Sequence, residues 1–182
     1  PPPPSPSPPP ECAKVQLSVK GWQMISFNCV GGLSNTFEVL DTAPWETDDK
    51  IMTRDPFLKF ATYDGEKFVG GLINHDQLLP SLGYKIFYSG EPANLTQTGS
   101  FQPVEDVVLR PGWNWIGHAP KDAVDIDEIE AIPYNAGGGF SVDDQIKTRA
   151  GSNVKYTTYT GVSWAGDVYQ LTPGIGYEVK VT

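Results

Sequence analysis

Short stretches that alternate polar and apolar residues recur along the chain and predict β-strands. Residues 59–63 (KFATY) and 155–159 (KYTTY) alternate polar and aromatic side chains, which is the period of a strand with one buried face. An Asp-Gly pair at 64–65 follows the first stretch directly and predicts a hairpin turn. Between such stretches Gly and Pro are abundant, with 19 and 17 residues, which favours many turns.

Two stretches favour short helices instead. Residues 125–131 begin with an Asp125 that can act as N-cap, followed by further acidic residues in the first turn. Residues 33–40 hold the corresponding place earlier in the chain, with Ser34 as a candidate cap. The pattern as a whole therefore predicts an all-β fold, mainly strands with short helical turns.

The chain contains the same series of motifs twice. Five blocks recur in the same order: 15–26 with 107–117, 48–54 with 143–149, 59–63 with 155–159, 68–70 with 164–166, and 79–86 with 172–179. A repeat of this kind predicts two homologous β-rich units in tandem. We place the first unit at 13–90, the second at 105–182, and a polar linker at 91–104.

The N-terminal residues 1–10 read PPPPSPSPPP. Proline fixes φ and lacks an amide donor, so we expect a polyproline II rod over 1–11, about 30 Å long. Because the chain opens within this tract, we expect it to be a piece of a longer secreted protein.

Charge and hydropathy narrow the classes of partner. The net charge is −9, and the 13 Lys and Arg residues are scattered singly along the sequence. We therefore expect no basic patch, no nucleic-acid partner and no attachment to anionic membranes. No run of 18 apolar residues occurs, so we also expect no membrane insertion.

The two cysteines, Cys12 and Cys29, are candidates for a disulfide that fixes the rod to the folded part. Such a bridge would close a loop and stabilise the fold by roughly 3 kcal/mol. Two buried free thiols are the alternative. A sequon at Asn94-Leu95-Thr96 also points to the secretory path, and Ser5 and Ser7 are further candidate glycosylation sites. These features favour a secreted protein of a cell surface, cell wall or extracellular matrix.

The repeated motifs carry a resemblance. The pattern Gly-Trp-Asn-x-Ile, Asp-x-Ile-Lys, Trp-x-Gly and Pro-Gly-x-Gly-Tyr resembles a repeat of secreted bacterial and algal surface proteins. The second unit fits it at Gly112, Trp113, Asn114, Ile116, Asp144, Ile146, Lys147, Trp164, Gly166, Pro173, Gly174, Gly176 and Tyr177; the first departs at Gln23, Phe68 and Ser81. The resemblance implies an accessory module of exported proteins without catalytic residues. The rod is similar to the proline-rich tracts of hydroxyproline-rich glycoproteins in green-algal walls.

No catalytic constellation stands out. The only histidines are His75 and His118, which we interpret as surface or packing residues. No nucleophile or metalloprotease motif occurs, and the three glycines at 137–139 lack the context of a phosphate loop. We therefore expect no enzymatic activity.

Paired carboxylates recur at one position of the repeat, as Asp48-Asp49 and Asp143-Asp144. Neighbouring residues of a strand face opposite ways, so a pair cannot easily flank one glycosidic bond. We interpret each pair as shaping a turn and a strand start. A structural Ca²⁺ site on these four residues is the alternative, and we expect no other cofactor.

Aromatic residues are the remaining candidates for a ligand site. We expect the signature residues Trp22, Trp113, Tyr84 and Tyr177 in the core. The candidates for ligand binding are Trp45, Trp115, Tyr134 and Trp164, because flat rings with a polar edge stack on sugars and on prolines.

These observations predict a non-enzymatic extracellular structural or adhesion module. We expect assembly through polyproline II recognition, with the same chain or other proline-rich surface glycoproteins as partners. The alternatives are a carbohydrate-binding module with a polysaccharide partner, and an accessory domain of a secreted hydrolase.

Overall fold

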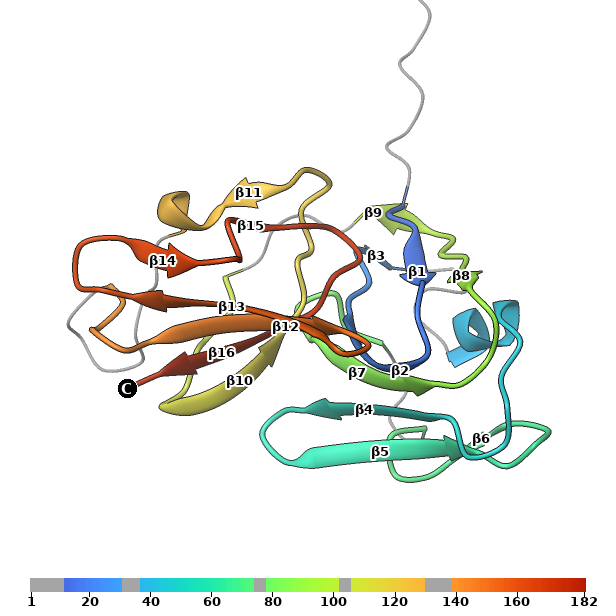
Figure 1. Ribbon diagram of the computed structural model, residues 1–182. Helices are drawn as coiled ribbons and strands as arrows, with labels where there is room; N and C mark the ends of the chain where they lie inside the picture. Colours follow the sequence, from blue (N-terminus) through green and yellow to red (C-terminus); the bar gives the residue numbers. More distant parts are fainter. Residues whose placement is uncertain (1–11, 31–36, 74–77, 102–105, 130–138) are drawn as a thin grey trace, which may run out of the picture.

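The computed structural model describes residues 12–30, 37–73, 78–101, 106–129 and 139–182, and its elements are labelled in Figure 1. These parts of the chain form mainly antiparallel β-strands, which confirms the all-β prediction. Their helical structure is limited to two short 3₁₀ turns, η2 (Phe37–Thr42) and η3 (Ile126–Glu128). The predicted rod at 1–11 lies outside the described residues.

Both 3₁₀ turns lie near the positions expected from the sequence. Asp125 is the N-cap of η3, and its carboxylate accepts a hydrogen bond from the amide of Asp127 at 3.0 Å. η2 continues past Leu40, where the sequence predicted its end, while the proposed cap Ser34 lies outside the described residues.

The strands divide into an earlier and a later set. The first half of the chain holds β1 (Val15–Leu17), β2 (Gly21–Ile25), β3 (Cys29–Val30), β4 (Lys50–Arg54), β5 (Leu58–Tyr63), β6 (Phe68–Val69), β7 (Tyr84–Tyr88), β8 (Ala93–Leu95) and β9 (Ser100–Phe101). The second half holds β10 (Gly112–Ile116), β11 (Val124–Asp125), β12 (Gln145–Ala150), β13 (Asn153–Tyr159), β14 (Trp164–Gly166), β15 (Gln170–Leu171) and β16 (Tyr177–Val181).

The two halves repeat one pattern of strand pairing. In the first half β7 pairs with β2 and β4, β4 pairs with β5, and β5 pairs with β6. In the second half β16 pairs with β10 and β12, β12 pairs with β13, and β13 pairs with β14. All five repeated sequence blocks therefore include strands that pair with corresponding strands in the two halves.

The halves share one large sheet, as the central strands in Figure 1 show. Its order is β10-β16-β12-β2-β7-β4-β5-β6, and the junction is the pairing of Ala150 on β12 with Gln23 on β2. The ends of β2 and β10 each also bridge to a turn of the other half, through Ile25–Ile175 and Ile116–Leu82. The second half is thus bonded to the first at several separate places.

Glycines permit this close approach at the exchanged turns. A Cβ on Gly83 would lie 2.7 Å from the carbonyl oxygen of Ile116, and a Cβ on Gly176 would overlap the carbonyl oxygen of Ile25. The Pro-x-x-Gly-Tyr motif therefore needs glycine because another backbone passes directly over it.

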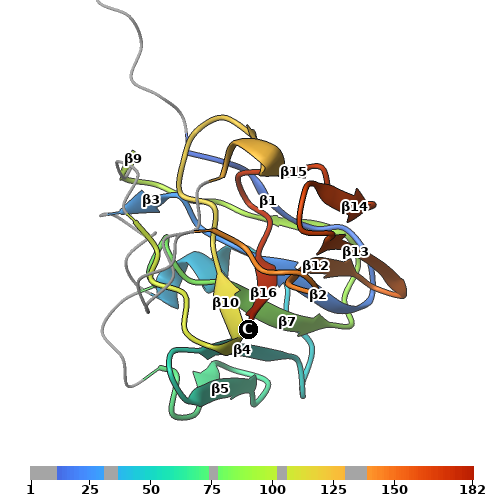
Figure 2. The same cartoon turned by 90° about the vertical axis from the view of Figure 1, so that its left-hand side faces the viewer.

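The shared sheet is strongly curved. β7 and β16 are separated in the sheet by β2 and β12, yet the Nζ atom of Lys85 lies 3.3 Å from Oε1 of Glu178. β10, at one end of the sheet order, comes back into contact with β4. Figure 2 shows these six strands grouped around a common centre. Side chains on the concave face consequently meet across the sheet.

The opposite, convex face carries the hydrophobic cores. The larger core belongs to the first half and includes Ile51, Ile86 and the fully buried Tyr88. The smaller core belongs to the second half and includes Ile146 and Val179. These residues alternate with half-buried or exposed ones along β4, β7, β12 and β16, so each strand has a core face and a concave face.

Part of the segment that we expected to be a linker is structured. β8 pairs with β1, β9 pairs with β3, and Leu95 and Gln97 are buried. Residues 93–101 are therefore part of the first half; residues 102–105 lie outside the described chain.

Candidate functional site

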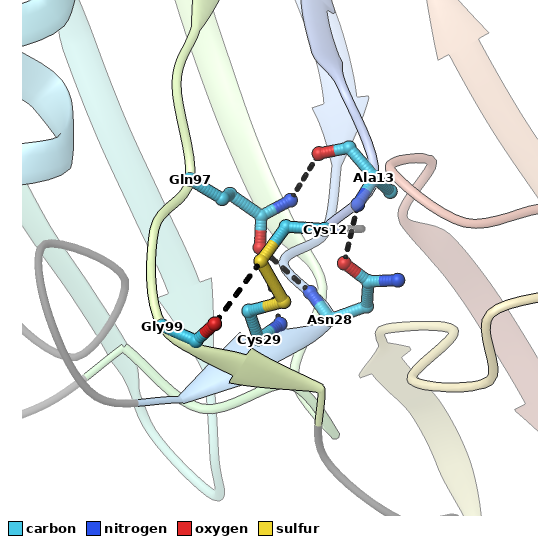
Figure 3. Close-up of a disulfide and its surroundings, with 6 residues drawn as sticks. All are labelled: Cys12, Ala13, Asn28, Cys29, Gln97 and Gly99. Atoms are coloured by element: carbon cyan, nitrogen blue, oxygen red, sulfur yellow. Dashed lines mark hydrogen bonds between the residues drawn. A yellow bond between two sulfur atoms is a disulfide. The ribbon is translucent and has the colours of Figure 1, made fainter. Parts of the chain in front are cut away.

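The predicted disulfide between Cys12 and Cys29 is present, with a Cα–Cα distance of 5.7 Å, which confirms this pairing over two free thiols. Figure 3 shows that it joins the start of the described chain to β3. The carbonyl oxygen of Gly99 lies 3.9 Å from the Cys12 sulfur, a packing contact because a disulfide sulfur has no hydrogen to donate.

Gln97 holds the backbone around this disulfide, as Figure 3 also shows. Its Oε1 accepts hydrogen bonds from the amides of Asn28 at 2.9 Å and Cys29 at 3.2 Å, while its Nε2 donates to the Ala13 carbonyl at 2.6 Å. No sequence pattern indicated this role, because Gln97 lies in the stretch that we expected to be a polar linker.

The candidate glycosylation site Asn94 is accessible. Asn94 lies on β8 opposite Gln16 and is exposed, as is Thr96, while Leu95 between them is buried. The alternation of the strand therefore turns the sequon outward. Ser5 and Ser7 lie outside the described residues.

The second carboxylate of each Asp pair is buried and fully engaged. Oδ2 of Asp49 accepts the Glu46 amide at 3.0 Å, and Oδ1 accepts both the amide and the hydroxyl of Ser89, at 2.9 and 2.7 Å. Asp49 thereby ties the turn before β4 to the end of β7.

Asp144 makes the same contacts in the second half. Its carboxylate accepts the Ser141 amide at 2.8 Å, the Thr182 amide at 2.9 Å and the Thr182 hydroxyl at 3.2 Å. The preceding residues, Asp48 and Asp143, have φ values of 75° and 72°, a left-handed backbone that Asp tolerates.

This geometry favours the turn-forming interpretation of the pairs over the Ca²⁺ alternative. Each buried carboxylate already accepts three hydrogen bonds from its own chain, so it shapes the turn as the sequence suggested. Within the described ranges, no three His, Cys, Asp or Glu side chains come together in a way that would hold a metal.

Two of the four aromatic candidates are packed into hydrophobic clusters. Trp45 packs edge-on against Phe68 and Tyr88 and donates its indole N–H to the Leu40 carbonyl at 2.5 Å. Trp164 packs against Phe140 and Tyr159. These two rings are engaged in the fold, and Tyr134 lies outside the described residues.

Trp115 lies in a cleft that we call the β10 cleft. The cleft has a volume of about 520 Å³ and forms where β10 approaches the end of β4. The residues that line it include Arg54, Asp55, Asp106, Arg110, Trp113 and Trp115. It therefore combines two indole rings with two guanidinium groups and two carboxylates.

Trp113 was expected in the core, and the structure places it differently. It is two residues from Trp115 on β10, so both side chains lie on the same face of the strand, and both are half-buried. That spacing was the signal in the sequence that could have identified Trp113. Tyr84 and Tyr177 are buried as expected, and burial raises the pKa of each phenol.

Charged and aromatic side chains meet at the centre of the concave face. The Glu178 carboxylate lies between Lys85 and Lys147, at 3.3 and 3.1 Å. The Lys147 ammonium lies 3.7 Å from the ring centre of Trp113, which is close enough for a cation–π interaction. The Lys85 ammonium lies 5.6 Å from the ring centre of Trp115 and 5.7 Å from that of Trp22.

The fold also corrects the expectation that the chain has no basic patch. The six strands that surround the concave face carry six cations, Lys50, Arg54, Lys85, Lys147, Arg149 and Lys180, and one acid, Glu178. By strand period and pairing, all seven lie on the face that carries Lys85 and Glu178, which is the concave face. Cations that are scattered along the sequence are gathered by strand alternation.

His118 has a structural position. It is 5% exposed, and its Nε2 lies 2.8 Å from the Asp122 carbonyl oxygen. Burial lowers its pKa, so the ring is held neutral and donates this hydrogen bond. His118 is thus occupied in packing, as the sequence suggested; His75 lies outside the described residues.

The fold and the candidate site define a disulfide-stabilised all-β protein with two similar halves, a concave cationic face and a cleft lined by tryptophan. None of the described helices is long and apolar enough to cross a bilayer. The disulfide is compatible with a secreted protein. Comparison with known proteins gives no match to any family model, curated protein or solved structure.

Proposed function

We propose that this chain is a non-enzymatic extracellular assembly module that binds proline-rich segments in the β10 cleft. The observation that carries the proposal is the meeting of two indole rings, Trp113 and Trp115, with the guanidinium groups of Arg54 and Arg110 in one cleft. The partners are other proline-rich surface glycoproteins or residues 1–10 of a second copy.

This combination of groups matches the chemistry of a polyproline II ligand. A proline-rich segment offers ring faces for packing against aromatic side chains, and its carbonyl oxygens are free because the helix has no internal hydrogen bonds. Its prolines have no backbone N–H, so most of its carbonyl oxygens need donors from the binding site. Arg54, Arg110 and the indole N–H groups are donors of this kind.

The repeat supplies a matched control for the test. Trp113 and Trp22 hold corresponding positions on β10 and β2, and both are half-buried on the concave face. Of the two, Trp113 lines the β10 cleft. Substitution of either residue removes one tryptophan from the same kind of surface.

The experiment is a calorimetric titration of the full chain, Trp113→Ala and Trp22→Ala with the peptide PPPPSPSPPP. We expect saturable binding that Trp113→Ala weakens about tenfold or more, since aromatic anchors dominate such interfaces, while Trp22→Ala retains it. Absence of binding to the native chain, or equal loss in both variants, would refute the proposal.

A further inference from the structure

We infer that the concave face is a second binding surface, and that its ligand is an acidic polysaccharide carrying carboxylate groups. This surface shares Arg54, Trp113 and Trp115 with the β10 cleft and extends beyond it. The inference rests on residues that the proposed function does not use: Lys50, Arg149 and Lys180 for charge, and Phe60 and Tyr156 for stacking.

The charge of this face is opposite to that of the protein. The chain carries a net charge of −9, whereas the six strands around the concave face bear six cations and one acid. Glu178 is paired with Lys85 and Lys147. Within the described chain, Lys50, Arg149 and Lys180 have no ion-pair partner. An anionic ligand would therefore meet cations that no carboxylate of the described residues neutralises.

Exposed aromatic rings flank these cations at corresponding positions. Phe60 on β5 lies opposite Met52 on β4, and Tyr156 on β13 lies opposite Lys147 on β12. Directly paired residues project to the same face of a sheet, so both rings belong to the concave face. They are 52% and 56% exposed, which is unusual for large rings in a sheet with cores of its own. Sugar rings stack on flat aromatic faces of this kind.

The carboxylate is the anionic group that this face already binds. The Glu178 side chain places one carboxylate between two lysines, with Trp113 and Trp115 beside those lysines. Arg149 adds a planar fork that suits a second carboxylate. A chain of uronic acid residues offers repeated carboxylates and stacking faces in one molecule.

A single-stranded nucleic acid has similar features, since it is anionic and its bases stack on aromatic rings. The disulfide favours the polysaccharide, because structural disulfides belong to oxidising extracellular settings. The test includes an oligonucleotide to separate the two ligands.

The test measures binding of the full chain to polygalacturonate oligomers, with the fully methyl-esterified oligomers as a matched neutral ligand. The face variant is Lys50→Gln with Arg149→Gln. The control variant is Lys14→Gln with Lys67→Gln, which removes the same charge from exposed positions away from the face. A third variant, Phe60→Ala with Tyr156→Ala, tests stacking. Circular dichroism and thermal unfolding establish that each variant is folded.

We expect saturable binding of the acidic oligomer, at least tenfold weaker for the methyl ester and weakened about tenfold between 50 and 500 mM NaCl. The affinity for the acidic oligomer should fall about tenfold in the face variant and by a similar factor in the stacking variant, while the control variant retains native affinity. Binding of the peptide PPPPSPSPPP should be unchanged in the face variant, which separates this surface from the β10 cleft.

Three results would overturn the inference. The first is no binding of the acidic oligomer, or equal binding of its methyl ester. The second is equal loss in the face and control variants, which would mean that net charge alone matters. The third is tighter binding of a single-stranded oligonucleotide than of the acidic oligomer.

Discussion

The two halves of the molecule share one pattern of strand pairing but differ in the size of their hydrophobic cores and in their additional short sheets. The first half buries sixteen hydrophobic residues in its core, and the second buries six, among the residues described. β1, β8, β3 and β9 add two short sheets to the first half, together with the disulfide. The second half has the shorter pair β11–β15 and the turn η3 in their place.

The same comparison on the concave face shows where the halves have different chemistry. Lys85 and Glu178 hold corresponding positions in the repeat and meet as an ion pair. Met24 on β2 corresponds to Trp115 on β10, which lines the cleft. The strand pattern is thus repeated, whereas the groups that can bind a ligand are not. The backbone is a common scaffold, and the cleft exists only where the second half supplies its side chains.

The largest effect is expected at the buried carboxylates, where the halves are alike. Asp49→Ala and Asp144→Ala should each lower the free energy of unfolding by about 4 kcal/mol, because three hydrogen bonds to a buried charge are lost. Urea unfolding measures both. If either variant lowers the free energy of unfolding by less than about 1 kcal/mol, the two carboxylates do not have equivalent roles. Asp127→Ala, at an exposed position, provides the control.

The disulfide is a feature of the first half alone and should have the next largest effect. Cys29→Ser together with Cys12→Ser should cost about 3 kcal/mol, since the unfolded chain regains the entropy of a closed loop. Unfolding of the native protein with and without reductant gives an independent value. If the variant and the reduced protein unfold at the same urea concentration as the oxidised protein, the bridge does not stabilise the first half.

The ion pair at the centre of the concave face should have a smaller effect. Lys85→Met should lower the free energy of unfolding by about 2 kcal/mol, because the half-buried Glu178 loses one of its two cations. Adding Glu178→Met should recover only part of that loss, because apolar groups replace the pair but Lys147 then loses its partner carboxylate. A double-mutant cycle from thermal unfolding measures the coupling; strictly additive losses would mean that the two charges do not interact.

The smallest effect concerns His118, which follows the strand of the second half where Phe27 or Asn28 stands in the first. Its pKa is lowered by burial, so the unfolded chain takes up a proton below about pH 6.5 before the folded chain does. Stability should be fully present above that pH and fall as the pH drops through the range between the two pKa values. His118→Gln should reduce the difference in unfolding free energy between pH 7.5 and 5.5; an unchanged difference would contradict this origin.

Much of the strand pattern could be predicted from the sequence, because it depends on local alternation and on turn residues. The alternation at 59–63 and 155–159 predicted β5 and β13, and the repeated blocks anticipated the repeated pairings. The contact of each half with a turn of the other half, through the bridges Ile25–Ile175 and Ile116–Leu82, could not be predicted in this way. It depends on Gly83 and Gly176 packing under a backbone that is remote in sequence.

The candidate site was predicted only in part. Of the four aromatic candidates, Trp115 lines the β10 cleft, whereas Trp45 and Trp164 are engaged in hydrophobic clusters. Trp113 was missed because a signature position suggested the core. The basic face was missed because the cations lie one or two to a strand. Lys147 contacts Glu178 from the neighbouring strand, and only sheet curvature brings Lys85 to the same carboxylate.

Binding of a proline-rich segment in the β10 cleft can be followed at the indole N–H resonances of the five tryptophans. The measurement is a nuclear magnetic resonance titration of the full chain with the peptide PPPPSPSPPP. We expect the signals of Trp113 and Trp115 to shift progressively to saturation, while those of Trp45 and Trp164 stay in place. An unchanged spectrum, or shifts confined to Trp45 and Trp164, would contradict this expectation.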